Sequence, residues 1–243
     1  MRLGYFAAAC LSVAISGIDV ADAIAQDVVK IGVVIPMTGG FASVRREVAD
    51  GAKLYIRQYG KTVAGRKVEL IIRDDAGVPD AGKRLAQELI VKDKVSFLGA
   101  GITPTAMAIA PLATEAKVAT VVMVSGTSVV TERSPYYVRT SFTLGQQSGI
   151  IADWATQNGS KKAVAIISDW APGAEASKVF DQHFTKGGGQ VLDTLKVPLA
   201  NPDFAPFLQR ARDLQPDTLF VFDRPERSLG SLPNAGSINR ASN

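Results

Sequence analysis

The sequence predicts an α/β fold with two doubly wound lobes, each built on a mainly parallel sheet. Between residues 28 and 222, short apolar runs typical of buried strands alternate with longer amphipathic segments typical of helices. Helical connections of this length make neighbouring strands parallel. Most strands also end in small or hydroxyl residues, at the edge where an open α/β sheet holds its ligand. The pattern therefore predicts a protein that binds a small molecule beyond its strand ends.

The first lobe is expected to span residues 26–145. Its first strand, 28–35, is a continuous apolar run, as expected for a strand buried on both faces. Pro79 opens a helix, where its missing N–H is harmless. Further strands are expected at 67–73, 95–99, 118–124 and 136–140, and helices at 46–59, 79–92 and 105–116. Helical periodicity places one set of apolar residues, Val48, Ala52, Tyr55, Ile56 and Tyr59, on one face of the first helix. It turns a second set, Leu85, Ala86, Leu89 and Ile90, inward in the helix at 79–92.

The alternation restarts after residue 145, which predicts a partial second lobe over residues 146–222. Helices are expected at 149–158, 173–186 and 204–214, and strands at 163–168, 191–197 and 218–222. Three glycines at 187–189 end the middle helix. After Phe222 the periodicity stops, and residues 223–243 are rich in Pro, Gly, Ser and Asn. We interpret them as a disordered tail and hypothesise that they are out-of-frame sequence.

The first 25 residues have the features of a cleaved signal peptide. Arg2 precedes an apolar run, and Ala23-Ile24-Ala25 is a small-x-small cleavage site. The run is shorter than the roughly 18 apolar residues of a membrane-spanning helix; a short anchor and lipidation at Cys10 are the alternatives. We therefore expect a periplasmic protein. Cys10 is the only cysteine and leaves with the leader, so no disulfide or thiol chemistry is expected in the mature chain.

Composition and motifs argue against catalysis and nucleic-acid binding. The net charge of +4 is scattered along the chain and forms no basic block. Neither a dinucleotide fingerprint nor a phosphate-binding loop occurs in the sequence. His183 is the only histidine, which disfavours a Ser/His relay or a transition-metal site. Asp74 and Asp75 point to opposite faces of a strand and cannot share one substrate. We expect no catalytic residue, no metal and no cofactor.

Five stretches form a characteristic succession along residues 28–222. They are VVKIGVVIP at 28–36, RDD at 73–75, RLAQELI at 84–90, GTS at 126–128 with YVRTS at 137–141, and NPDFAPF at 201–207. This succession resembles the periplasmic solute-binding proteins of ABC importers, in the Leu/Ile/Val-type branch. The resemblance implies the type I periplasmic binding protein fold, whose two lobes close on a ligand like a hinged clamp. Because the family usually continues well past this length, it also implies that the second lobe is incomplete.

The resemblance also implies where the ligand is held. In the family, the loop after the third strand holds a ligand carboxylate with a hydroxyl and backbone N–H groups. Here that loop is Thr103-Pro104-Thr105, at a helix N-terminus that favours an anion. The loop Gly126-Thr127-Ser128 supplies a second set of contacts, and Trp170 stands where relatives place an aromatic side chain over the ligand. The structural alternatives are a helix N-cap, turn chemistry and packing beneath residues 171–173.

The implied function is capture of a small carboxylate-bearing solute for delivery to a membrane ABC permease. The solute would be an amino acid or a small organic or aromatic acid. We expect a monomer with no nucleic-acid partner. Two alternatives stay open from the sequence: a ligand-sensing receptor domain of the same fold, and a truncated fragment without function. The identity of the ligand is not readable, because hydroxyl and N–H donors recognise any carboxylate.

Overall fold

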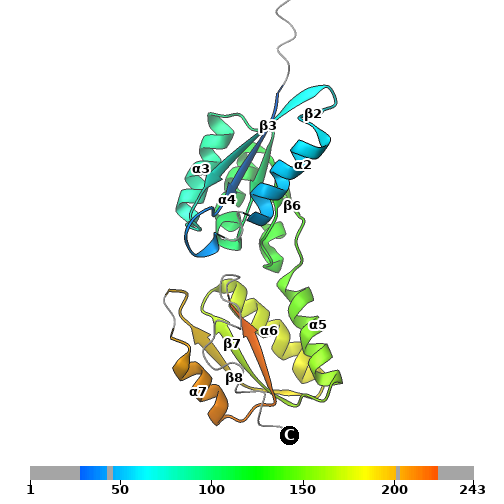
Figure 1. Cartoon of the computed structure of the whole chain (residues 1–243), viewed down its shortest axis with the longest axis vertical. Coiled ribbons are helices and arrows are strands. Elements are labelled where there is room, and N and C mark those ends of the chain that lie inside the picture. The colour runs from blue at the N-terminus through cyan, green and yellow to red at the C-terminus, as the bar shows by residue number, and fades with distance from the viewer. Residues whose placement is uncertain (1–27, 43–45, 201–202, 224–243) are drawn as a thin grey trace, which may run out of the picture.

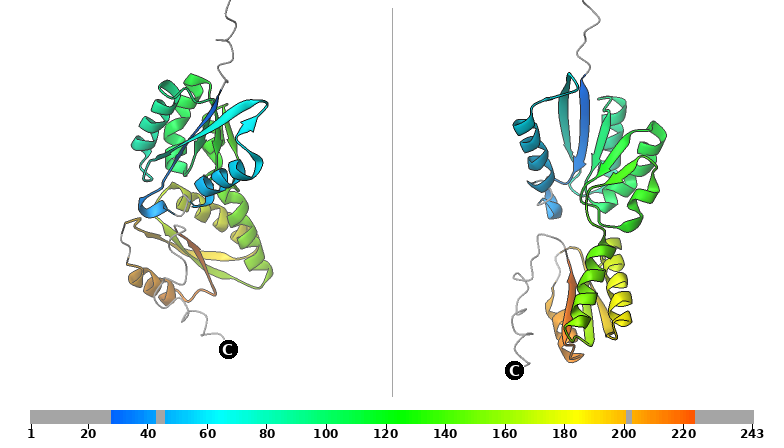
Figure 2. Two further views of the ribbon diagram at one scale, coloured as in Figure 1. Left: turned by 45° about the horizontal axis from the view of Figure 1, so that its top comes forward. Right: turned by 90° about the vertical axis from the view of Figure 1, so that its right-hand side faces the viewer.

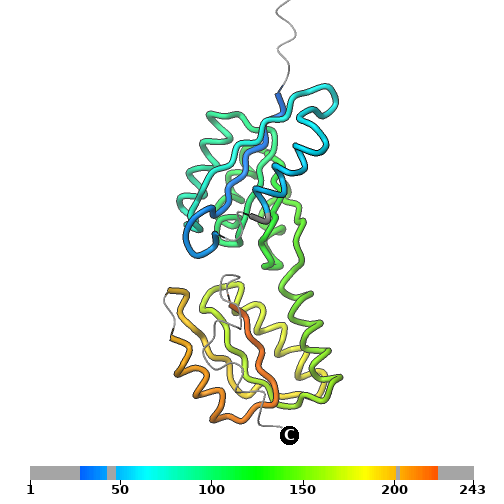
Figure 3. The backbone as a smooth tube through the Cα atoms, in the orientation of Figure 1, coloured from blue at the N-terminus to red at the C-terminus, as the bar shows by residue number. Residues whose placement is uncertain are grey.

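The chain folds into two α/β lobes, one holding strands β1 to β6 and the other β7 to β9 (Figures 1 and 2). The computed structural model describes residues 28–42, 46–200 and 203–223. The predicted signal peptide, residues 1–25, and residues 224–243 of the predicted tail lie outside the described residues. The tube in Figure 3 shows the chain leaving the first lobe after β6 and running directly into α5 (Leu144–Gln157) of the second lobe. The predicted fold class, two lobes with parallel sheets, is confirmed.

Six strands form the sheet of the first lobe in the order β2-β3-β1-β4-β5-β6. All neighbouring strands pair in parallel except β2 and β3, which form a short hairpin that the sequence analysis did not predict. The strand order reverses beside β1, and this switch point is where open α/β sheets place ligands. The bounds are β1 Val29–Ile35, β2 Thr62–Val63, β3 Arg66–Asp74, β4 Phe97–Ala100, β5 Ala119–Val122 and β6 Tyr137–Arg139.

Helices cover both faces of this sheet (Figure 2, right). Helices α3 (Pro79–Val91) and α4 (Thr103–Ala116) pack on one face around a core that includes fully buried Leu89 and Ile109. Ala49, just before α2 (Gly51–Tyr59), packs against Val33 and Ile35 on the other face. The predicted inward face of α3 is confirmed: Ala86 and Leu89 are buried, and Leu85 and Ile90 are partly buried against the same core.

The helix expected at 46–59 is present, but the two tyrosines on its apolar face are exposed. Tyr55 and Tyr59 are 64% and 73% exposed, and their rings pack against each other with centroids 4.6 Å apart. The segment begins with a π-helical turn, Arg46–Asp50, and only then becomes α-helical. A π turn contains more residues than an α turn. It therefore changes the phase only of the positions before Gly51, whereas positions 52, 55, 56 and 59 keep regular α-helical spacing. No residue of α2 is buried, so this face lies at the margin of the core and its two tyrosines cover each other.

The second lobe has a three-stranded parallel sheet in the order β8-β7-β9. Its strands are β7 Lys162–Ser168, β8 Gln190–Val197 and β9 Thr218–Phe222, with helices α5 Leu144–Gln157, α6 Ala171–Lys186 and α7 Ala205–Asp213. Residues of α5 and α6 share one core cluster with the sheet, and α7 packs in another. Phe180 stacks on both Phe184 and Phe220, with ring centroids 5.2 and 4.2 Å away. Among the described residues, no helix has the length and apolar character of a membrane span.

Helix α5 starts five residues earlier than the sequence analysis expected. Thr143 and Gln146 form a capping box: the Thr143 side chain accepts from the Gln146 N–H, and the Gln146 side chain accepts from the Thr143 N–H. This reciprocal pair satisfies two backbone donors and fixes the first turn at Leu144. The lobe boundary proposed at residue 145 therefore falls inside the first turn of α5.

The packing of α3 on α4 yields a testable pair of variants. A Cβ added at Gly82 would stand 2.5 Å from Thr105 Cγ2 and 3.3 Å from Asp75 Oδ2, whereas nothing lies within 4 Å of a Cβ added at Gly51. Gly82→Ala is expected to lower the free energy of unfolding by about 1–3 kcal/mol through overpacking. Gly51→Ala, the matched control, is expected to raise it by up to about 1 kcal/mol through helix propensity. Urea denaturation measures the free energy of unfolding of both variants. A Gly82→Ala variant as stable as wild type would contradict the packing of α3 on α4 described above.

Candidate ligand-binding site

The two loops predicted to hold the ligand lie side by side at the carboxyl ends of β4 and β5. Thr103 stands in the first turn of α4, immediately after β4, and Thr127 follows β5. The Thr103 hydroxyl donates a hydrogen bond to Thr127 Oγ1 at 3.1 Å, and both residues are more than nine-tenths buried. Parallel strands leave their carboxyl ends at the same edge of the sheet, so residues 24 positions apart meet there.

The third residue of the first loop, Thr105, faces a different partner. Its side chain is fully buried and donates a hydrogen bond to Asp75 Oδ2, and the Gly77 N–H donates to Asp75 Oδ1 at 3.0 Å. This geometry gives Thr105 a structural role, joining α4 to the loop after β3. Pro104 lies in the first turn of α4 and is half-buried, in a position that suits proline. Ligand contacts by Pro104 and Thr105 stay predictions.

Adjacent carboxylates Asp74 and Asp75 have opposite environments. Burial raises the pKa of Asp75, although hydrogen bonds from Thr105 and Gly77 lower it in part. For Asp74, slight desolvation raises the pKa, but hydrogen bonds from the Met37 N–H, the Thr38 hydroxyl and backbone N–H groups outweigh it, and the net pKa is lowered. Asp74 thereby ties the loop after β1 to the end of β3, with donor–acceptor distances of 2.8 Å from Met37 and 2.7 Å from Thr38. The two carboxylates have separate partners and do not form a shared site.

Arg139 on β6 holds the second predicted loop in place. Its guanidinium donates to the carbonyl oxygens of Ser125 and Thr127, both at 2.7 Å, and of Ser128 at 2.9 Å. The Ser125 hydroxyl donates in turn to the carbonyl of Gly101, at the end of β4. These bonds fix the carbonyl groups of the loop and so set the direction of its N–H groups. The sequence analysis did not assign this role, because nothing local distinguishes Arg139 from a surface arginine.

Ser128 lies where the first lobe touches the second. Its N–H and hydroxyl both donate to Glu175 Oε1, at 2.9 and 2.6 Å respectively. Glu175 belongs to α6, which follows the central strand β7 of the second lobe. Gly126 of the same loop lies against Leu144: its carbonyl accepts from the Leu144 N–H at 2.7 Å, and an added Cβ would meet the leucine side chain at 3.0 Å. The loop at 126–128 therefore contacts both helices at the start of the second lobe.

Trp170 forms another contact between the lobes. It precedes the first turn of α6, and its ring lies 5.5 Å from that of Phe41, in the loop after β1. Its indole Nε1 is buried and has no hydrogen-bond acceptor among the residues that the structure describes. A buried donor without an acceptor is costly, which marks a position that a ligand or water oxygen would satisfy. The sequence analysis singled out Trp170 but not Phe41 or Glu175.

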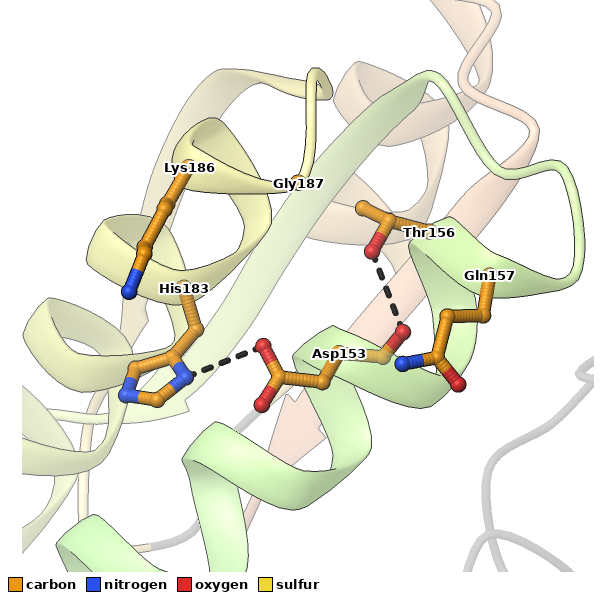
Figure 4. A pocket seen from close by; sticks show the side chains of 6 residues that line it. All are labelled: Asp153, Thr156, Gln157, His183, Lys186 and Gly187. Atoms are coloured by element: carbon orange, nitrogen blue, oxygen red, sulfur yellow. Dashed lines mark hydrogen bonds and ion pairs between the residues drawn. The ribbon is translucent and has the colours of Figure 1, made fainter.

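A cavity of about 360 Å³ lies elsewhere, between the far ends of α5 and α6 (Figure 4). Asp153 and His183 line it and bond to each other, Oδ1 to Nδ1, at 3.0 Å, and Thr156, Gln157 and Lys186 complete its polar rim. Because α6 starts at the carboxyl end of β7, its last turn lies at the opposite end of the strands. Ligands of open α/β sheets bind beyond the carboxyl ends. His183 is half-exposed and paired with Asp153.

Comparison with known proteins identifies the family. The model of the periplasmic binding protein family matches residues 28–235, so this chain belongs to that family, which is made of binding proteins. Leu/Ile/Val-binding protein homolog 6 of Brucella suis is 41% identical over 204 residues, covering 83% of this chain and 52% of the relative. The chain thus spans about half the length of the curated relatives it matches.

Solved structures extend the similarity to proteins with bound acids. A solute-binding protein of an ABC transporter from Rhodopseudomonas palustris BisB5, in complex with 3,4-dihydroxybenzoic acid, is 58% identical with a TM-score of 0.79, covering 82% of this chain and 55% of that one. Another from strain HaA2, in complex with p-hydroxybenzoic acid, is 42% identical with a TM-score of 0.78, covering 81% and 54%. A leucine-binding protein from Thermotoga maritima is 31% identical with a TM-score of 0.73, covering 79% and 55%.

The opposite pKa shifts of Asp74 and Asp75 predict opposite pH effects on stability. A lowered folded-state pKa gives Asp74 a stabilising contribution above the unfolded value of about 3.9, which is lost as pH falls. A raised folded-state pKa has the opposite effect for Asp75. Its stabilising contribution is fully present below the unfolded pKa and is lost as pH rises through the folded-state pKa.

Urea denaturation of Asp74→Asn and Asp75→Asn between pH 3 and pH 8 tests these signs. Asp74→Asn is expected to be less stable than wild type at pH 7, with the gap closing toward pH 3. Asp75→Asn keeps a neutral side chain of the same shape, so its stability relative to wild type is expected to increase with pH. Parallel pH profiles for the two variants would contradict the environments described.

The role of Arg139 predicts a loss that a lysine cannot restore. Arg139→Ala removes three hydrogen bonds from a charged donor and is expected to lower the free energy of unfolding by about 2–3 kcal/mol. The carbonyl oxygens of Ser125 and Thr127 keep weaker donors, the Ser141 hydroxyl and the Val130 N–H. Arg139→Lys keeps the charge but lacks the planar fork that reaches all three oxygens, so most of the loss should remain. Arg133→Ala removes an exposed arginine from the same segment and is the control. Thermal unfolding measures all three variants, and full rescue by lysine would show that charge alone matters.

Proposed function

We propose that this chain is the solute-binding component of an ABC importer and captures a small aromatic carboxylic acid. The observation that carries the proposal is the convergence at one junction of three kinds of group. They are the strand-end loops with Thr103 and Ser128, the N-terminus of α6 and the aromatic pair Phe41–Trp170. An amino acid is the alternative solute, which the Leu/Ile/Val-binding relatives favour.

The chemistry of the junction supports an acid as the solute. Thr103 lies in the first turn of α4, at the helix N-terminus, where the helix dipole favours a negative charge. Ser128 offers an N–H and a hydroxyl whose acceptor here is itself a carboxylate, that of Glu175. Hydrogen bonds from such donors to an ionised oxygen are stronger than those between neutral groups.

The aromatic pair supports a benzene ring as the body of the solute. Aromatic rings stack or pack edge-to-face at the separations that Phe41 and Trp170 adopt. The buried Nε1 of Trp170, which has no acceptor within the part of the chain that the structure describes, supplies a donor for a carboxylate or hydroxyl oxygen. The 58% identical protein bound to 3,4-dihydroxybenzoic acid and the 42% identical protein bound to p-hydroxybenzoic acid support hydroxylated benzoates in particular.

The proposed setting is the periplasm, which the family implies for this chain. We propose that the leader is removed after Ala25 and that the mature protein acts as a monomer that docks on a membrane permease. It would work without a cofactor, metal or catalytic residue, since its task is to bind a solute and release it unchanged. Gly126 and Thr127 would then shape the loop that presents Ser128, while Thr105 would anchor α4.

A panel of acids tests the proposed solute class. At a concentration one hundred times its dissociation constant, a ligand stabilises the folded protein by about 2.7 kcal/mol. For a chain of this size that corresponds to a rise in Tm of about 5–10 °C. We expect this rise with 3,4-dihydroxybenzoate or 4-hydroxybenzoate and a smaller one with leucine, measured by differential scanning fluorimetry. A larger rise with leucine would favour the amino-acid alternative, and no rise with any acid would contradict the proposal.

Trp170→Phe separates stacking from hydrogen bonding at the same site. The variant keeps an aromatic ring but removes the buried indole N–H. If that donor binds the ring hydroxyl, the affinity for 4-hydroxybenzoate should fall about tenfold while that for benzoate stays unchanged, as measured by isothermal titration calorimetry. An equal fall for both acids would assign the donor to the carboxylate, and no fall for either would remove Trp170 from the polar part of the site.

A further inference from the structure

Both polar donors of Ser128 converge on a single carboxylate oxygen. The N–H and the hydroxyl lie 2.9 and 2.6 Å from Glu175 Oε1, and each donates to it. Two donors that converge on one point suit the oxygen of a carboxylate ligand. Hydrogen bonds of this length to an ionised acceptor are stronger than hydrogen bonds between neutral groups. Ser128 itself is exposed and Glu175 is half-buried, so solvent and solutes reach the donors when the pair separates.

The surroundings of the pair keep the two partners aligned. Arg139 binds the carbonyl oxygens on either side of the Ser128 N–H, those of Thr127 and Ser128, so the direction of that N–H is fixed from within the first lobe. Glu175 lies in the second turn of α6, near the positive end of the helix dipole, and α6 is packed in the core of the second lobe through Phe180 and Phe184. A bond between two rigidly held groups restrains the lobes to which they belong.

We propose that Glu175 is an internal latch that occupies the carboxylate-binding donors of Ser128 when no solute is bound. The side chain imitates the acid group of a solute and holds the two lobes together from within the protein. An incoming acid displaces Glu175 from Ser128, so part of its binding energy is used to open the latch. The competition with solute rests on the proposed function, whereas the latch between the lobes does not depend on it.

The latch has a measurable effect on affinity. When a binding site is free in only a fraction of the molecules, the apparent affinity for the ligand is the intrinsic affinity multiplied by that fraction. Glu175→Ala is therefore expected to bind 4-hydroxybenzoate about three- to tenfold more tightly than wild type. Glu175→Gln keeps a neutral acceptor for Ser128 and is expected to lie between the two. Asp169→Asn removes a nearby exposed carboxylate on the same lobe and controls for a general loss of negative charge.

The decisive experiment measures the distance between the lobes without any solute. Nitroxide labels are placed on Lys83→Cys in α3 and Gln182→Cys in α6, both exposed, in a background in which the only native cysteine, Cys10, is serine. Double electron–electron resonance then gives the distance distribution. Wild type and Asp169→Asn are expected to show one narrow population. Glu175→Ala is expected to shift most of it to longer distances. Ser128→Ala keeps the N–H donor and is expected to shift a smaller part, and the double variant should shift it no further than Glu175→Ala alone.

The outcomes separate the latch from the proposed function. Unchanged ligand-free distances in Glu175→Ala would overturn the latch, even if the variant bound acids more tightly, because loss of charge repulsion would then be sufficient. A distance shift confined to Glu175→Ala and Ser128→Ala would support the latch, even if none of the acids bound to any variant. The absence of binding would count against the proposed function alone. Thermal unfolding of each variant confirms that the compared proteins are folded.

Discussion

Parallel pairing in the order β3-β1-β4-β5 is the constraint on which the candidate site depends. It sends the carboxyl ends of four strands to one edge of the sheet, so that short loops from distant parts of the sequence meet there. Thr103 and Thr127 touch because of this placement, and Asp74 at the end of β3 reaches the loop after β1 for the same reason. Neither contact could form if the strands ran antiparallel with the same loops.

Hydrogen bonds with two side chains hold the backbone of these loops in place. Arg139 satisfies three carbonyl groups after β5, and Asp74 accepts from the Met37 N–H and the Thr38 hydroxyl after β1. Main-chain groups whose direction is fixed by such bonds can recognise an anion without a basic side chain pointing at it. The scattered charge of the sequence is compatible with this mode of recognition, in which the basic residue stands behind the loop.

The regular parts of the fold were predictable from the sequence, and the contacts between distant residues were not. Strands β1 and β7 are continuous apolar runs, and α3 repeats its apolar residues at helical spacing, so local pattern was sufficient. The start of α5 was missed although the Thr143–Gln146 capping box is visible in the sequence. Tyr55 and Tyr59 fall on the apolar face of α2 as their spacing indicates, but periodicity does not tell how deeply a face is buried, and no residue of α2 is buried. The roles of Arg139, Glu175 and Phe41 depend on partners far along the chain, which periodicity does not reveal.

The position of Trp170 and Glu175 at one end of α6 has a mechanical consequence. The helix contains 16 residues, and at 1.5 Å per residue it is a rod about 24 Å long. A tilt of about 10° at its first turn would move its last turn by about 4 Å, since a packed helix turns as a unit. Any event that reorients the tryptophan end is thus amplified at the lysine end, on the outer surface of the second lobe.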